Sequence, residues 1–293
     1  MNIRLLRAFA AVIDHRSFSR AAEAIHVSQP AVSKAVKELE NQVNTALLER
    51  RGRQIDVTEA GAALYAHARG IFALEKAAEA DLRARQGLER GSLTIGASTA
   101  IATFMLPALL AQYLSHSPLI RVKVVSGNTD AIEKRLLSYE LDLALIEAPV
   151  DNSRLHQEFW REEELIILAP AGHPLLSQKR ICVADLSRQR WIVREEGSGT
   201  RAVALALLLE AGVAVRDTME VCGNGAVIHS VGHGLGIAMA SAAAASEHIA
   251  LGKVGIVQFH TRFKRTLYRV RLRDRPLGPA ARAFEALLSQ APP

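Results

Sequence analysis

The chain has 293 residues, of which 49% are hydrophobic and 23% are charged, and its formal net charge is +6. This length predicts two or three domains, and the composition excludes a disordered or fibrous protein. The mild positive charge fits a nucleic-acid binder, but many enzymes share it. Two cysteines, Cys182 and Cys222, give no disulfide framework and no metal-ligand spacing, so each is expected as a small buried residue in or beside a strand.

We expect no signal peptide at the amino terminus and no membrane-spanning segment in the apolar stretch 234–246. The apolar run at the amino terminus stops at Asp14 and His15, and no small-residue cleavage site follows it. The most apolar later stretch, 234–246, is too short to span a bilayer. We therefore expect a cytoplasmic protein that has no membrane partner.

Residues 1–57 are predicted to form a small, mostly helical module. Its central run, SFSRAAEAIHVSQPAVSKAVKELE, is typical of two helices joined by a tight turn, since alanines in the first helix allow a close crossing. Ser28 is a favourable N-cap, and Pro30 is tolerated in the first turn of the helix that follows. At helical spacing, the apolar residues of this second helix form one stripe, and polar residues lie on the opposite face. The stripe is Val32, Val36, Leu39 and Val43, and the face is Pro30, Ser33, Lys34, Lys37 and Asn41.

The next segment is predicted to be a hairpin, with strands at 47–48 and 55–57 around an arginine-rich tip. Arginines at such a tip suit phosphates or a narrow minor groove. A basic helix face alone is usually solvated, and an arginine-rich loop alone is usually only a loop. Together and in this order they indicate DNA binding. The predicted DNA-binding residues are Ser28, Gln29, Pro30, Ser33, Lys34, Lys37, Arg50, Arg51 and Arg53.

Residues 58–88 are predicted to form one long helix, with Thr58 as its N-cap and Gly87 as its stop. An apolar stripe at helical spacing needs a partner, and association of two copies of the chain would supply one. The alternative is that the stripe packs on the chain's own neighbouring module. The stripe consists of Leu64, Ala68, Ile71, Ala78 and Leu82.

From residue 91 the pattern changes to alternating strands and helices, which predicts an α/β domain with parallel sheets. Strands are expected at 92–95, 120–125, 143–146, 166–169, 191–193, 218–221, 237–240, 256–259 and 268–272. Helices are expected at 103–114, 130–139, 202–210, 226–231 and 280–288. About 200 residues with so many strands favour two lobes. We place lobe I at about 91–163 and 267–293, and lobe II at about 164–266.

Four loops with hydroxyl, amide or guanidinium groups follow predicted strands, where ligands collect in open α/β sheets. These donors favour a small anionic effector between the lobes. Each Ser or Thr could instead be an ordinary helix cap, and Arg201 could be a surface charge or pair with Glu195 or Glu196. The predicted effector-binding residues are Ser98, Thr99, Asn128, Glu147, Ser198, Thr200, Arg201 and Asn224.

Two other functions and one metal site are alternatives to this hypothesis. Gly197 to Ala202 matches a G-x-G-x-x-A dinucleotide fingerprint, with Glu220 near the place of a ribose-binding acid, so a nucleotide-dependent enzyme is the first alternative. A solute-binding protein without a regulatory role is the second. His229 and His233 have metal-compatible spacing but no third ligand. We predict no catalytic residue, no cofactor, no metal and no enzymatic activity.

The chain closely resembles the LysR-type transcriptional regulators of bacteria. The matching segments are AFAAVIDHRSFSRAAEAIHVSQPAVSKAVKELE, LLERRGR and VTEAG. The later segments PAGHPL, EGSGTR and GHGLGIA extend the resemblance over nearly the whole chain. It implies an N-terminal winged helix-turn-helix (1–57), a linker and dimerisation helix (58–88), and a two-lobed α/β effector domain of the periplasmic-binding-protein type (91–293).

The same resemblance implies how such a protein works. It would bind double-stranded promoter DNA as a homodimer or homotetramer and respond to a small molecule, with RNA polymerase as a further partner. Carried over by position, Gln29, Pro30, Ser33 and Lys34 would meet the major groove. The tip arginines would meet the DNA backbone or minor groove. The GSGTR segment resembles branches of the family that sense carbon-fixation or sulfur metabolites.

Overall fold

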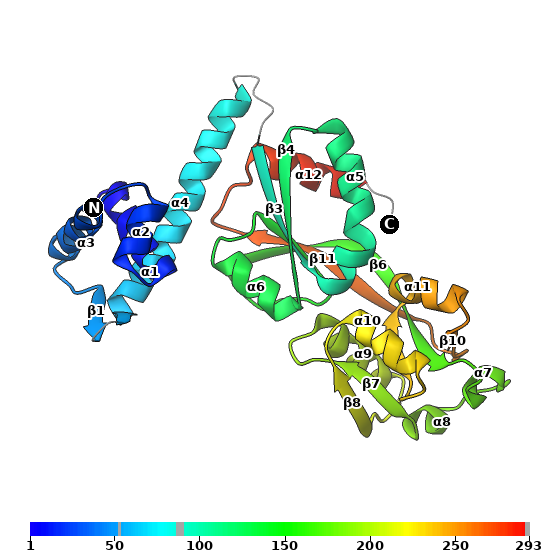
Figure 1. Ribbon diagram of the computed structural model, residues 1–293. Coiled ribbons are helices and arrows are strands. Elements are labelled where there is room, and N and C mark those ends of the chain that lie inside the picture. The colour runs from blue at the N-terminus through cyan, green and yellow to red at the C-terminus, as the bar shows by residue number, and fades with distance from the viewer. Residues whose placement is uncertain (52–53, 86–90, 291–293) are drawn as a thin grey trace. The chain divides into compact units, whose positions relative to one another are not determined.

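The structure is a computed structural model that describes residues 1–51, 54–85 and 91–290. The chain divides into two compact units, Met1–Lys76 and Ala77–Pro293 (Figure 1). Each unit has its own hydrophobic core. Within the described ranges, no helix combines the length and the apolar character needed to cross a bilayer.

The first unit is a winged helix-turn-helix, as predicted. Ser17 and Ser28 each accept a backbone N–H at the start of a helix, which fixes where the second and third helices begin. Ala21 and Ala22 are buried, and such small side chains let these helices pack closely. The elements are α1 (Ile3–His15), α2 (Phe18–Ala24), α3 (Gln29–Val43), β1 (Leu48–Arg51) and β2 (Gln54–Val57).

The long helix α4 (Glu59–Arg85) starts where the sequence predicts. The backbone amide of Gly61 donates to Thr58 Oγ1 at 2.9 Å, so Thr58 is the N-cap. Gly61 also lies so close to the hairpin that a Cβ there would be 2.1 Å from the carbonyl oxygen of Leu47. The expected stop, Gly87, lies outside the described residues.

The apolar stripe of α4 has two different environments. Ala68 is fully buried, and Leu64 and Ile71 pack around it in the core of the first unit. The prediction of a partner-facing stripe along the whole helix is therefore wrong for its first half. The reason is that the winged helix-turn-helix has an apolar face of its own, which this half of the helix covers. Ala78 is exposed and Leu82 is 62% exposed.

The second unit is built on a seven-stranded sheet, in the order β10-β6-β11-β5-β3-β4, with β9 also paired to β6. The strands β3 (Gly91–Ser98), β4 (Ile120–Gly127) and β5 (Leu143–Ile146) are parallel, as predicted. Around them lie η1 (Ile101–Met105), α5 (Leu106–His116), α6 (Thr129–Leu137) and α12 (Pro279–Gln290). These elements form lobe I (Figure 1).

Two long antiparallel strands, β6 (Leu155–Pro170) and β11 (Phe263–Leu272), run from lobe I into lobe II. Trp160 and Leu267 belong to the core of lobe I, whereas Leu165 and Phe263 belong to the core of lobe II. The remaining elements of lobe II are α7 (Pro174–Ser177), α8 (Val183–Ser187), β7 (Arg190–Arg194), α9 (Gly199–Glu210), β8 (Asp217–Val221), α10 (Asn224–Gly232), β9 (Ala238–Ser241), α11 (Ala242–Ala250) and β10 (Val254–Ile256).

Several expectations for this unit need correction. The sheet is mixed, since β6 pairs antiparallel with β9, β10 and β11. The strand predicted at 166–169 is only the end of a 16-residue strand, because the charged first half of β6 is exposed on one face and gives no apolar run. The cysteines are not buried. Cys182 is the exposed N-cap residue of α8, and Cys222 is exposed after β8.

Candidate functional site

The helix α3 presents a polar face that is free of the core. Val32, Val36 and Leu39 are buried, which confirms the predicted stripe and turns the opposite side outward. On that side Lys34 and Lys37 are exposed. Ser28, Gln29 and Pro30 are also exposed at the start of the helix. The half-buried Ser33 accepts a hydrogen bond of 2.8 Å from Gln29 Nε2. Such a face can enter a major groove and meet both bases and phosphates.

The hairpin is fixed to α3 by one carboxylate. Glu40 Oε1 accepts the backbone amides of Leu47 at 2.9 Å and Leu48 at 3.2 Å, where β1 begins. In β1, Arg50 and Arg51 pair through their backbones with β2. The side chains of the predicted tip arginines and the whole of Arg53 lie outside the described residues, so their DNA contacts stay predictions from the sequence.

The predicted effector residues of lobe I lie at the carboxyl ends of its parallel strands. Ser98 ends β3 and is 1% exposed, and Thr99 Oγ1 donates to the carbonyl of Gly127 at the end of β4. Glu147 follows β5 and is 2% exposed. Parallel strands place these ends at one edge of the sheet, so the three side chains come from the same side of lobe I.

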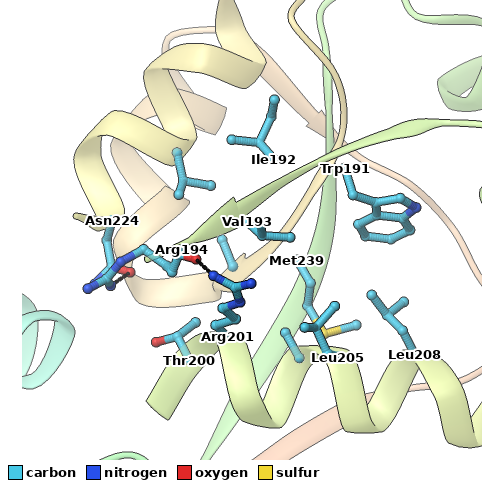
Figure 2. Close-up of a pocket in the computed structure, with 13 residues that line it drawn as sticks. Trp191, Ile192, Val193, Arg194, Thr200, Arg201, Leu205, Leu208, Asn224 and Met239 are labelled. Atoms are coloured by element: carbon cyan, nitrogen blue, oxygen red, sulfur yellow. Dashed lines mark hydrogen bonds between the residues drawn. The ribbon is translucent and has the colours of Figure 1, made fainter. Parts of the chain in front are cut away.

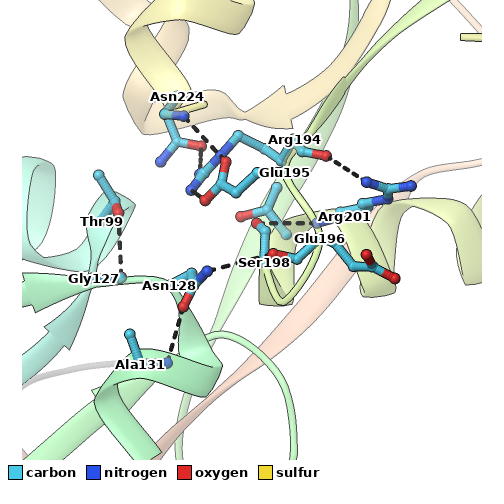
Figure 3. Close-up of polar contacts among 12 residues, drawn as sticks. Thr99, Gly127, Asn128, Ala131, Arg194, Glu195, Glu196, Ser198, Arg201 and Asn224 are labelled. Carbon is cyan, nitrogen blue, oxygen red and sulfur yellow. Dashed lines mark hydrogen bonds and ion pairs between the residues drawn. The ribbon is translucent and has the colours of Figure 1, made fainter. Parts of the chain in front are cut away.

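Lobe II meets this edge with the N-termini of α9 and α10. Asn128, the N-cap of α6, donates through Nδ2 to the carbonyl of Glu196 at 3.4 Å, and so links the lobes (Figure 3). A Cβ on Gly199 would be 2.5 Å from Thr129 Oγ1, a measure of how closely the two lobes approach. We call this region, where the ends of β3, β4 and β5 face the starts of α9 and α10, the interlobe junction.

The alternative roles left open by the sequence apply to two of the predicted residues. Ser198 is the N-cap of α9 and accepts the amide of Arg201, so it has an ordinary capping role. Arg201 is ion-paired, but its partner is Glu220 rather than Glu195 or Glu196. It also donates to the carbonyl of Arg194 at 3.1 Å (Figure 3). Its charge is therefore already neutralised within lobe II.

Arg194, which the sequence analysis missed, orients Asn224. Its Nη1 donates to Asn224 Oδ1 at 2.6 Å, which leaves the amide Nδ2 of Asn224 as the free donor. The guanidinium also pairs with Glu195 through two hydrogen bonds of 2.6 and 2.7 Å. These bonds, together with the backbone amide of Gly223, lower the pKa of Glu195 to about 2.

A small pocket of lobe II opens beside these groups (Figure 2). Its volume of about 20 Å³ has room for a water-sized group. Arg194, Thr200 and Asn224 lie at one end, and Trp191 and Leu208 lie at the other (Figure 2). The pocket therefore passes from polar at the junction to apolar in the core of lobe II.

A second missed residue, Arg265 on β11, is fully buried at the junction. It contacts carboxylates of Glu163 and Glu147 and the hydroxyl of Thr200. The sequence does contain a pattern that indicates the buried position of Arg265. Arg265 shares the inward alternation of Phe263 and Leu267, so a charged residue occupies a core-facing position.

Buried polar atoms without a hydrogen-bond partner gather at the junction. Among the residues that the structure describes, these include Ser98 Oγ, Thr129 Oγ1, Glu147 Oε1 and Asn224 Nδ2. Folded proteins rarely leave such atoms unpaired, so several in one region indicate a place for a polar ligand. Thr129 belongs to one of the four loops expected to collect a ligand, although it was not among the predicted effector-binding residues.

The residues of the competing hypotheses have contacts within the protein. The glycine loop of the dinucleotide fingerprint packs against lobe I, since a Cβ on Gly197 would be 2.8 Å from Asp130 Oδ2. His229 stacks edge-on against His248. The described part of the chain contains no group of three or more side chains suited to hold a metal.

The helix-turn-helix part of the chain and its two-lobed part each match a known protein family. Residues 3–62 match the bacterial regulatory helix-turn-helix family of LysR type, and residues 86–292 match the LysR substrate binding domain. The chain is 35% identical to the RuBisCO operon transcriptional regulator of Allochromatium vinosum, over 99% of this chain and 97% of that protein.

Solved structures show the same fold. A full-length OxyR variant from Pseudomonas aeruginosa superposes with a TM-score of 0.79 at 24% identity, covering 99% of this chain and 95% of that one. The regulatory domain of Synechocystis CcmR, solved with 2-PG, has a TM-score of 0.63 at 26% identity and covers 68% of this chain and 96% of that one. With both domain families matched in order and a relative aligned along almost its whole length, this chain belongs to the family of LysR-type transcriptional regulators.

Proposed function

We propose that the protein reads promoter DNA with the exposed face of α3 and the adjacent hairpin, and that a small anion bound at the interlobe junction changes this binding. The observation that carries the effector site is the group of buried, unpartnered atoms on Ser98, Thr129, Glu147 and Asn224. They come from both lobes, so a ligand that pairs with them would favour one arrangement of the lobes over others.

The anionic character of the effector is inferred from the donors at the junction. The helices α6, α9 and α10 begin at this region, and the N-terminus of a helix carries a partial positive charge. By contrast, Arg194, Arg201 and Arg265 are each ion-paired within the protein. The attraction for an anion would thus come from helix ends, hydroxyls and the Asn224 amide rather than from an unpaired guanidinium.

The relatives favour a metabolite class. A regulator of a RuBisCO operon is similar over the full length, and a domain solved with 2-PG shares the effector fold. The GSGTR segment at the start of α9 resembles the same branches of the family. We therefore propose a small acid of carbon-fixation or sulfur metabolism as the effector.

The second half of α4 would join two copies of the chain. Leu74 and Leu82 are 44% and 62% exposed, and with Ala78 they form a row at spacing i, i+4, i+8 on one face of the helix. The double substitution Leu74→Glu and Leu82→Glu should yield monomers in sedimentation velocity, whereas Glu79→Gln on the same helix should not. A dimer that survives the double substitution would contradict this role.

The effector proposal is tested by ligand-dependent stability. The full-length protein is screened by thermal shift against central-metabolism acids, phosphosugars and sulfur compounds, because a ligand that binds the native state raises its apparent stability. The expected result is saturable stabilisation by at least one small anion. If none stabilises the protein, the anionic effector is wrong.

A further inference from the structure

At the interlobe junction, two buried carboxylates share one guanidinium. Arg265 and Glu163 are direct cross-strand neighbours on β11 and β6, and Arg265 Nε donates to Glu163 Oε2 at 2.6 Å. The same guanidinium reaches Glu147 Oε2 through Nη1 at 3.3 Å. All three side chains are at most 6% exposed. The group therefore places two carboxyl groups against a single guanidinium in a region that water barely reaches.

The hydrogen-bond directions around Glu147 follow from the donor and acceptor types. Arg265 can only donate, so Thr200 Oγ1 accepts from its Nη1 at 2.8 Å. The single hydroxyl proton of Thr200 is then free for Glu147 Oε2, at 2.5 Å. Thr200 is thus fully used as a positioning residue and has no proton left for a ligand.

Of the four carboxylate oxygens, only one lacks a donor. Glu163 Oε1 accepts the hydroxyl of Ser241 on β9, and both Oε2 atoms have the partners described above. Glu147 Oε1 is buried and, within the described ranges, has no partner. An unpaired buried carboxylate oxygen is costly, and no described residue donates to this one, so the hydrogen-bond donor of a ligand would stabilise it.

The other unpaired atoms of the junction have the opposite need. Ser98 Oγ and Thr129 Oγ1 are hydroxyls that can donate, and the free atom of Asn224 is an N–H₂ donor. They suit acceptor oxygens of an anion. Thr129 and Ala148, the residue after Glu147, both lie against Gly199, so Thr129 and the chain beside Glu147 come together at the start of α9.

We propose that Glu147 makes the site selective for oxyanions that carry their own hydrogen-bond donor, such as a hydrogen phosphate group or the hydroxyl of a hydroxy acid. The ligand's O–H would donate to Glu147 Oε1, and its other oxygens would accept from the surrounding hydroxyls and amide. An oxyanion without a proton would instead place an acceptor against a carboxylate and be rejected. This inference rests on the proposed effector site and names the chemistry that it accepts.

Inorganic phosphate and sulfate are matched probes, because both are tetrahedral oxyanions and only phosphate keeps an O–H near neutral pH. Equilibrium dialysis of the full-length protein with radiolabelled phosphate or sulfate, at equal ionic strength, measures each affinity directly. The wild-type protein should bind phosphate at least about tenfold more tightly than sulfate. Equal affinities, tighter sulfate binding, or no phosphate binding at millimolar concentrations would each overturn the proposal.

The substitution Glu147→Gln tests the residue itself. Its amide oxygen can still accept from Thr200, and its N–H₂ group then replaces the unpaired oxygen, so the preference should reverse toward sulfate. Glu210→Gln, which changes an exposed carboxylate at the end of α9, is the matched control and should keep the phosphate preference. A Glu147→Gln protein that folds and still prefers phosphate would contradict the proposal. If this variant does not fold, the wild-type comparison decides.

The two proposals can fail separately. A protein whose DNA binding responds to a metabolite, but which does not prefer phosphate to sulfate, would keep the proposed function and lose this inference. Conversely, a clear phosphate preference without any effect of small anions on DNA binding would leave the donor selectivity standing and remove the regulatory role.

Discussion

Replacing Arg265 by methionine should destabilise the second unit more than any surface change near it. The guanidinium is fully buried and contacts Glu163, Glu147 and Thr200, so its removal leaves two buried carboxylates without the positive charge that pairs with both of them. Breaking a buried pair in this way costs about 3–5 kcal/mol. For a unit of this size, each kcal/mol lowers the Tm by about 2–4 °C, which gives a loss of about 6–20 °C.

The assay uses intrinsic fluorescence, because both tryptophans, Trp160 and Trp191, are buried in the second unit and report its unfolding. The control is Lys264→Ala on the neighbouring position of β11, whose ion pair with Glu162 is more than half exposed. An exposed pair contributes less than about 1 kcal/mol, so this variant should melt near the wild type. If Arg265→Met shifted the Tm no more than Lys264→Ala, the buried charge group would not have the role described.

Three further predictions concern other parts of the molecule. Gly61→Ala places a Cβ 2.1 Å from the Leu47 carbonyl oxygen, so it should destabilise the first unit by about 1–3 kcal/mol and weaken DNA binding. Unfolding followed by circular dichroism should show this loss, while the tryptophan fluorescence transition of the second unit stays unchanged. A first unit of unchanged stability would contradict the close packing. Lys34→Ala should weaken binding to all DNA duplexes and reduce the slope of log affinity against log salt concentration by about one. Fluorescence anisotropy measures both quantities. An unchanged slope would mean that Lys34 does not contact a phosphate. The pKa of Glu195 is lowered to about 2 in the folded protein, so its charge stabilises the fold above the unfolded value of about 4.3 and this contribution is lost as pH falls toward 2. Glu195→Gln should therefore lower the Tm at neutral pH and flatten its dependence over that acid range; a dependence equal to that of the wild type would exclude the pair as a source of stability.

The sequence predicts the first unit well because its signals are local. Ser28, Pro30 and the spacing of Val32, Val36 and Leu39 are sufficient to start α3 and to choose its buried face. In the second unit, short apolar strands such as β5 are also found at their predicted positions. These features depend on residues that are neighbours along the chain, and their patterns can be read without knowing the fold.

The interlobe junction was only partly predictable, because its key contacts join distant residues. Thr200 and Glu147 were expected as ligand contacts, but their hydrogen bond across 53 positions becomes visible only when the lobes come together. Arg265 was not expected there because the strand was predicted only at 268–272, whereas β11 begins at Phe263 and includes Arg265. The partner of Arg201, Glu220, likewise depends on how α9 packs against β8.

The sharpest test of the account measures DNA binding and effector response in the same protein. An operator duplex is selected in vitro with the full-length wild type, and its Kd is measured with and without the most stabilising metabolite from the thermal-shift screen. The wild-type Kd should change with the metabolite, whereas Ser98→Leu, which fills the junction at the end of β3, should bind the duplex equally well and show no change. A Ser98→Leu protein that folds and still responds to the metabolite, or one that loses the operator altogether, would contradict an effector site at the interlobe junction.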